Sequence, residues 1–107
     1  MEMTKAQRRL LRDLCLVAYE AEAREALASL DDDFRRWRER EIGSEGLIDA
    51  IHQFHQHEAR ELYSIYSSRD ELLTARRAVA LGFIPEDDIP ESLRPILQEQ
   101  IEAQRRR

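Results

Sequence analysis

Three histidines on one short segment are the residues in this chain best suited to chemistry. His52, His55 and His57 lie within six positions, and Asp49 precedes His52 by three. A carboxylate three residues before a histidine is the spacing used in carboxylate-bridged di-iron helical bundles. On a helix His52 and His55 are neighbours, whereas His57 points well away from both. A metal-dependent enzyme centred on Asp49, His52 and His55 is therefore one hypothesis.

The rest of the sequence gives this hypothesis little support. No second pair of this kind is present, and the single cysteine, Cys15, has no histidine near it in sequence. Cys15 lies between apolar positions of a predicted helix and is typical of a small buried hydrophobic residue. His55 borders an apolar helix face and is expected to pack there. Gly-rich phosphate loops and serine-nucleophile motifs are missing. We predict a non-enzymatic protein with neither cofactor nor metal.

Two groups of basic residues lie near the ends of the first predicted helix. Lys5, Arg8, Arg9 and Arg12 follow the spacing i, i+3, i+4, i+7 and form one stripe. Their charge opposes the helix dipole at that end, so helix stability alone does not account for them. Basic residues also flank Trp37. The candidate interaction surface comprises Lys5, Arg8, Arg9, Arg12, Arg36, Trp37, Arg40, His52 and His55.

Acidic residues separate the two basic groups and limit what each can bind. Glu20, Glu22, Glu25 and the run 31–33 would repel a nucleic-acid backbone laid along the helix. The blocks also bear on self-association. A two-fold antiparallel dimer centred on the helix midpoint would place like charges together, so a dimer is expected to be offset.

Composition narrows the class of protein. The chain has 107 residues, the size of one domain, with 36% charged residues, a net charge of -5 and a pI near 5.2. This balance disfavours nucleic acid and favours a basic protein as partner. We expect no membrane segment and no signal peptide, and hence a cytoplasmic protein. Arginine in place of lysine and the lack of asparagine indicate a GC-rich, bacterial genome.

The apolar periodicity predicts an all-α, elongated four-helix bundle forming a single domain. Thr4 and Gln7 form a capping box, Ser44 is expected to cap the second helix, and Ser68 with Glu71 is expected to cap the third. Gly43 and Gly82 are expected to end the helices before them. The predicted helices cover 5–41, 45–66, 69–81 and 92–105, with a solvated acidic, proline-containing linker at 83–91.

The first helix is expected to run unbroken through Asp31–Asp33, because the apolar residues Leu27, Leu30, Phe34 and Trp37 stay in phase. Leu10, Leu14, Val17 and Ala21 form a separate apolar stripe nearer the N-terminus. A helix of this length spans roughly 57 Å, whereas a compact chain of this size has a radius of gyration of roughly 13 Å. Either the third and fourth helices dock beside it, or a second copy covers the remainder.

The second predicted helix has one apolar face with a single polar interruption, Glu58. The face comprises Leu47, Ile51, Phe54, Glu58, Leu62 and Ile65. Five aromatic residues are expected to build the core between the first two helices, although Trp37 and one tyrosine could instead form an exposed recognition patch. These five are Phe34, Trp37, Phe54, Tyr63 and Tyr66.

A pattern across the first two helices resembles one in small uncharacterised bacterial all-helical proteins. It covers about a quarter of the chain, and the resemblance implies a reused helical hairpin with no activity attached. The residues that carry it are Trp37, Ile42, Ser44, Leu47, Ile51, His52, Phe54, His55, Arg60, Glu61, Leu62 and Tyr63.

We therefore expect a protein-binding or regulatory protein, such as an acidic inhibitor or antitoxin-like partner of a basic protein, which itself could be a homodimer. A nucleic-acid-associated regulator that uses the basic N-terminal stripe is the first alternative. A metal-dependent helical enzyme is the second.

Overall fold

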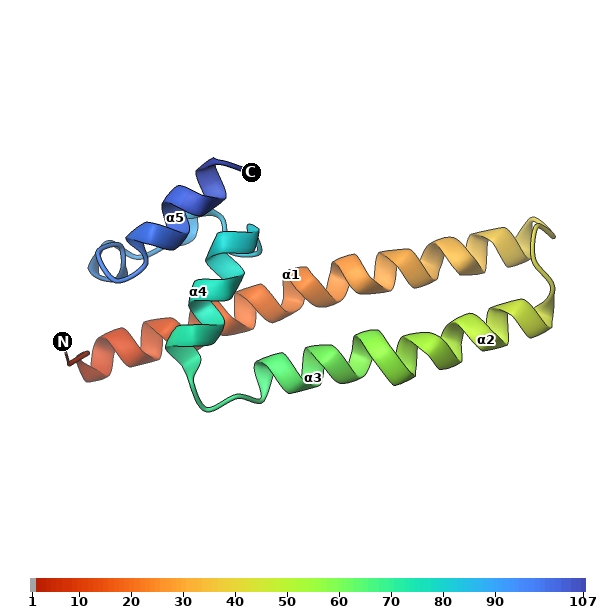
Figure 1. Cartoon of the computed structure of the whole chain (residues 1–107), viewed down its shortest axis with the longest axis horizontal. Coiled ribbons are helices and arrows are strands. Elements are labelled where there is room, and N and C mark those ends of the chain that lie inside the picture. The colour runs from red at the N-terminus through yellow and green to blue at the C-terminus, as the bar shows by residue number, and fades with distance from the viewer. Residues whose placement is uncertain (1) are drawn as a thin grey trace.

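The computed structural model describes residues 2–107, which form helices and turns without a β-strand (Figure 1). Helix α1 (Lys5–Arg38) runs the length of the molecule, which measures 54 × 27 × 16 Å. Three consecutive elements form one continuous helical segment beside α1, which we call the second rod. They are α2 (Ser44–Phe54), a π-helical turn η1 (His55–Ala59) and α3 (Arg60–Tyr66). Helices α4 (Glu71–Leu81) and α5 (Gln98–Arg105) complete the chain. The all-α, elongated fold with a long first helix is confirmed.

Helix α1 begins and continues as the sequence predicts. The Thr4 hydroxyl accepts the Gln7 N–H at 3.0 Å, and the Gln7 side chain accepts the Thr4 N–H at 2.9 Å, which closes the capping box. The helix is unbroken through the acidic run. There, Asp32 pairs with Arg35 and Asp33 with Arg36, each one turn further along the helix, so the aspartates have partners on the helix surface.

The end of α1 differs from the prediction. The helix ends at Arg38, and Arg40 adopts the left-handed conformation with φ of +63°, a position expected for Gly43. The N–H of Arg40 donates to the Trp37 carbonyl and the N–H of Glu41 to the Arg36 carbonyl, which is the Schellman pattern. Gly43 is extended and caps α2 without a side chain. Ser44 is the first residue of α2 rather than its cap.

The buried core lies along the N-terminal half of α1, where α4 packs against α1 and α5 packs against α4 (Figure 1). Of the two arrangements expected for a helix of this length, docking of both later helices along α1 is therefore present only in part, because α4 packs on α1 whereas α5 packs on α4. The core uses Leu11, Leu14 and Ala18, whereas Val17 and Leu27, expected inside, are exposed. The prediction for Val17 and Leu27 is wrong because the elements that cover α1 pack on one face of its N-terminal half and on a different face of its C-terminal half.

The π-helical turn η1 explains why Glu58 interrupts the apolar face predicted for the second helix. Between residues 44 and 64 the least exposed positions are Leu47, Ala50, Phe54, Ala59 and Leu62, so the step from Phe54 to Ala59 is five residues instead of three or four. One extra residue per turn is what a π-bulge supplies. Ala59, rather than Glu58, takes the next position towards α1.

After α3, several helix boundaries in the structure also differ from the predicted ones. Asp70, not Ser68, caps α4 through the Leu73 N–H at 3.0 Å, and Gly82 ends α4 with φ of +86° as predicted. The predicted linker 83–91 is not merely a solvated turn, because Ile84 and Ile89 are buried and a 3-10 turn (Glu86–Asp88) lies between them.

Helix α5 begins at residue 98 instead of 92. A single 3-10 turn (Glu91–Leu93) precedes it, and Pro95 has no N–H to donate to the Glu91 carbonyl, so one hydrogen bond of a regular α-helix is missing between that turn and α5. Within residues 2–107 no helix has both the length and the apolar character to cross a membrane.

Candidate functional site

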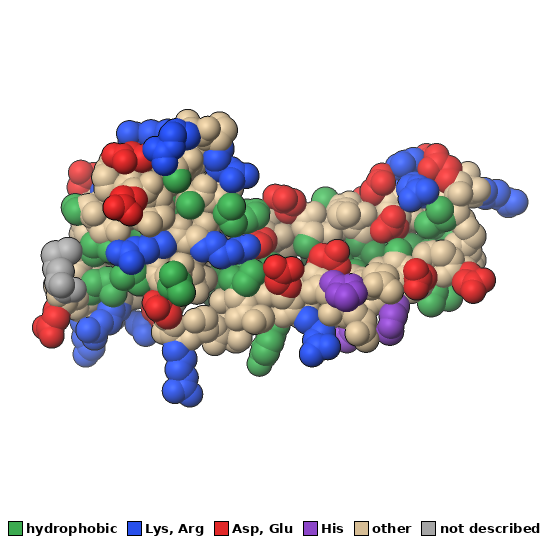
Figure 2. Space-filling model, viewed as in Figure 1, with side chains coloured by type: hydrophobic (Ala, Val, Ile, Leu, Met, Phe, Trp, Pro, Cys, Tyr) green, Lys and Arg blue, Asp and Glu red, His purple; other side chains and the backbone are tan. Residues whose placement is uncertain are grey.

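The three residues of the predicted metal site share no enclosed position. Asp49, His52 and His55 are all exposed, and His55 does not pack into the core as expected. Within residues 2–107, histidine, cysteine and carboxylate side chains form no group of three or more that could hold a metal ion. Figure 2 shows histidines at the surface, away from the buried block of α4 and α5.

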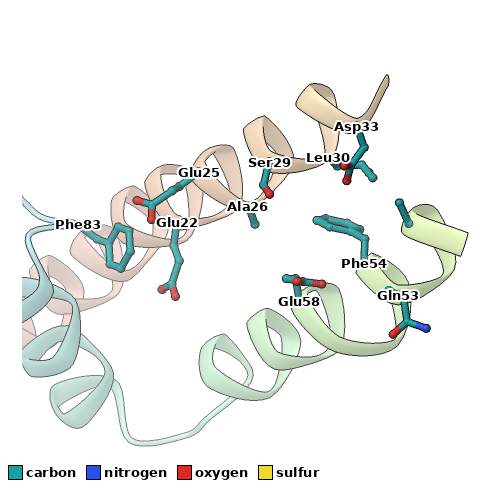
Figure 3. Close-up of a pocket in the computed structure, with 11 residues that line it drawn as sticks. Glu22, Glu25, Ala26, Ser29, Leu30, Asp33, Gln53, Phe54, Glu58 and Phe83 are labelled. Atoms are coloured by element: carbon teal, nitrogen blue, oxygen red, sulfur yellow. The ribbon is translucent and has the colours of Figure 1, made fainter. Parts of the chain in front are cut away.

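A groove lies between α1 and the second rod, beyond the end of the α4–α5 block (Figure 3). It has a volume of about 580 Å³. We call it the acidic groove and define it by its four carboxylates and its apolar floor. The carboxylates are Glu22, Glu25, Asp33 and Glu58, and the floor comprises Ala26, Leu30, Ala50, Phe54 and Phe83.

The groove continues a helix face that is covered further towards the N-terminus. On α1, Leu11, Leu14 and Ala18 are buried by α4 and the segment before α5. The positions one and two turns beyond Ala18 on the same side include Glu22 and Glu25. Phe83, from the turn after α4, closes this end of the groove (Figure 3). The uncovered part of this α1 face is thus a groove beside the second rod, and a third helix packed there would cover it.

The charge of the groove is of one sign. Among residues 2–107, no Lys, Arg or His side chain lines it. Glu22 and Asp33 have basic partners outside it, at 2.8 Å from Arg77 and 3.8 Å from Arg36. Glu25 and Glu58 are exposed and form no ion pair with the described residues. Two uncompensated carboxylates therefore face an apolar floor, and Figure 2 shows acidic side chains over the middle of the molecule.

Glu22 is held in place by two other helices. Its carboxylate accepts hydrogen bonds from both Arg77 Nη atoms, at 2.8 and 2.9 Å, and from the Tyr66 hydroxyl, at 2.7 Å. The Arg77 hydrogen bonds lower the pKa of Glu22, with the Tyr66 hydroxyl acting in the same sense, against the effect of partial burial. Burial and the Glu22 carboxylate raise the pKa of Tyr66. This cluster is a fixed rim of the groove, since three hydrogen bonds from α3 and α4 hold the Glu22 carboxylate.

The predicted basic stripe lies on an exposed part of α1, and one further basic residue, Arg69, lies beside it. Lys5, Arg8, Arg9 and Arg12 are exposed and form no ion pair within residues 2–107. Arg69, from the connection between α3 and α4, lines a hollow of about 270 Å³ together with Arg8 and Arg12. Asp70 and Glu71 also line it. These five basic residues form the surface that we call the basic end.

The second predicted basic group, at the opposite end, is mostly engaged within the chain. Arg36 pairs with Asp33 and Glu41, and the Trp37 indole N–H donates to the Ser44 hydroxyl at 3.1 Å. Arg40 forms no ion pair in the described part of the chain. Trp37 and Arg40 line a shallow hollow of about 490 Å³. The predicted surface is thus split between two ends and one outer helix face, rather than gathered in one patch.

The predicted aromatic core between the first two helices is only partly present. Phe34, Phe54 and Tyr66 are half-buried, and Tyr66 packs edge-on against Tyr19 with ring centroids 5.4 Å apart. Trp37 is 40% exposed and Tyr63 is 75% exposed. The expectation of a fully shared aromatic core is therefore wrong, because the second rod covers α1 with one narrow face.

Cys15 is half-buried, and its thiol donates to the Glu71 carbonyl at 3.6 Å. Burial, with a smaller contribution from the Glu71 charge, raises the pKa of Cys15 to about 11. Little reactive thiolate exists at neutral pH, which suits the structural role expected for this residue.

Sequence reasoning missed the acidic groove. The one signal that pointed to it was Glu58, a carboxylate on an otherwise apolar stripe. Comparison with known proteins gives no further indication, since no family model, no curated protein and no solved structure matches this chain.

Proposed function

We propose that this chain is a non-catalytic protein-binding module whose acidic groove takes a basic amphipathic helix. The observation that carries the proposal is the pairing of an apolar floor with two carboxylates, Glu25 and Glu58, that have no partner among the described residues. Apolar side chains on the floor favour a ligand with its own apolar face. The free carboxylates favour Lys or Arg at the margins of that face.

The size of the groove supports a helix as the ligand. Along α1 it extends from Glu22 to Asp33, which is about 17 Å and matches roughly three helical turns. A helix seated there would lie in the same layer as α4 and α5 and would pack against two helices at once. An inhibitor or antitoxin that acts on a basic protein is a role of this kind.

The proposal can be tested with a synthetic probe of defined chemistry. A labelled twelve-residue peptide with leucines on one helix face and arginines beside them is titrated with the chain, and binding is followed by fluorescence anisotropy. A second peptide carries glutamate in place of arginine. We expect saturable binding of the arginine peptide, weakened by salt, and no binding of the glutamate peptide.

A matched pair of variants locates the binding. In Glu25→Gln/Glu58→Gln both free groove carboxylates become neutral, and affinity should fall roughly tenfold, since each exposed ion pair contributes up to about 1 kcal/mol. Glu91→Gln/Glu99→Gln makes the same change in charge at exposed positions that do not line the groove. Equal losses in the two variants would mean that net charge, not the groove, attracts the peptide.

A further inference from the structure

The acidic groove and the basic end are complementary surfaces on the same molecule. The groove has carboxylates over an apolar floor and no basic lining residue. The basic end has Lys5, Arg8, Arg9 and Arg12 on one helix face, with Arg69 beside them. Neither Glu25 and Glu58 nor these basic residues are neutralised by an ion pair within residues 2–107. The groove is therefore acidic and the basic end is mainly basic, with Asp70 and Glu71 beside Arg69.

The two surfaces also match in length and character. The exposed face of α1 from Lys5 to Leu16 and the groove from Glu22 to Asp33 each cover eleven residue steps, about 17 Å. Leu16 is 69% exposed and continues the basic face with an apolar side chain. The aliphatic stems of arginine can cover an apolar floor while their guanidinium groups reach the carboxylates at its edge. The exposed face of α1 from Lys5 to Leu16 is thus a basic surface with one apolar side chain, since Leu11 and Leu14 of the same segment are buried in the chain's own core.

We propose that the occupant of the acidic groove is a second copy of this chain, which inserts the basic end of its α1. This inference rests on the proposed function and names the partner. The contact is heterologous, because the surface used on one copy differs from that used on the other. A contact of groove with groove would set four carboxylates against four, and like charges at an interface are costly.

The contact is expected to be weak and salt-dependent. One helix of three turns buries less surface than a permanent dimer does, so association requires high protein concentration. Its charged groups lie near solvent, where salt screens them. We therefore expect the mass in solution to rise from the monomer value of 12.7 kDa with concentration at low salt, and to return towards it at high salt.

A charge-swap experiment by sedimentation velocity tests this contact. The groove variant carries Glu25→Arg and Glu58→Arg, and the end variant carries Arg8→Glu and Arg12→Glu. All four side chains are exposed and unpaired within the described residues, so both variants should fold, as circular dichroism would verify. Each variant alone should lose association roughly tenfold or more, and an equimolar mixture of the two should recover it. The control Arg60→Glu/Arg106→Glu, which reverses exposed bases elsewhere, should associate like the unchanged chain.

Several results would overturn the inference. They are a chain that stays monomeric at every concentration in low salt, association that survives in both variants, and a mixture that does not recover it. A monomeric chain that binds duplex DNA, with binding lost in the end variant, would assign the basic end to nucleic acid instead. Binding of the arginine peptide to a groove on a monomeric chain would leave the proposed function standing while the second copy is excluded as occupant.

Discussion

The carboxylate of Glu22 on α1 accepts two hydrogen bonds from the guanidinium of Arg77 on α4, 55 residues later in the chain. This bidentate pair joins the long helix to the block that covers its N-terminal half. It lies where the covered part of α1 gives way to the open groove. The pair therefore fixes both the position of α4 and one rim of the groove.

Loss of Arg77 should destabilise the fold. Arg77→Leu leaves the Glu22 carboxylate, which is mostly buried, with only the Tyr66 hydroxyl as partner, at a cost of about 1–3 kcal/mol. In Glu22→Gln/Arg77→Leu part of that cost should be recovered, because no charge is left unpaired. Urea unfolding followed by circular dichroism measures both. Arg24→Leu breaks an exposed pair with Glu20 and should change stability by less than about 1 kcal/mol.

Stability should fall in acid as Glu86 becomes protonated. Hydrogen bonds from Arg105 and Arg94 lower the pKa of Glu86 from 4.5 to about 2. The unfolded chain binds the proton more readily than the folded one, so the stabilisation is full above pH 4.5 and is lost as pH falls towards 2. Thermal unfolding across this range should show a steeper decline for the unchanged chain than for Glu86→Gln. Parallel curves would mean that Glu86 does not contribute.

The π-helical turn predicts opposite effects for deletion and insertion at Gln56. Deletion shortens the step from Phe54 to Ala59 to four residues, which a regular α-helix accommodates, so the unfolding free energy should stay equal or rise. Insertion of an alanine after Gln56 rotates Leu62 by about 100° away from α1 and should cost roughly 2–5 kcal/mol of burial. Thermal melts compare the two. A deletion variant that unfolds more easily would show that the bulge itself is needed for packing.

Arg40 should be replaceable by glycine with a gain in stability. It has the left-handed conformation, φ of +63°, in which a side chain costs about 1 kcal/mol that glycine avoids. We expect Arg40→Gly to raise the unfolding free energy by roughly 0.5–1 kcal/mol. Arg38→Gly, two residues earlier and still helical, should lower it by about as much. If both variants lose stability, the Arg40 side chain makes a contribution that outweighs its backbone strain.

Local patterns in the sequence were sufficient to predict the helices. The capping box at Thr4, the continuous phase of Leu30 and Phe34 across the acidic run, and the left-handed Gly82 each depend on residues within one or two turns. Interactions of that range are encoded by neighbours in sequence, so they could be predicted without a fold. The elongated all-α architecture followed from the same information.

The candidate site depended on contacts that no local pattern encodes. Phe83 meets α1 only because Gly82 turns the chain after α4, and Arg69 joins Arg8 because of where α3 ends. Which face of α1 is covered changes along its length, and this placed Val17 and Leu27 outside against expectation. The sequence alone determined which helices form, where the first begins and where the later ones end, at residues 66, 81 and 105. Only the packing of those helices decided which carboxylates gather at the open groove, because packing depends on residues far apart in the chain.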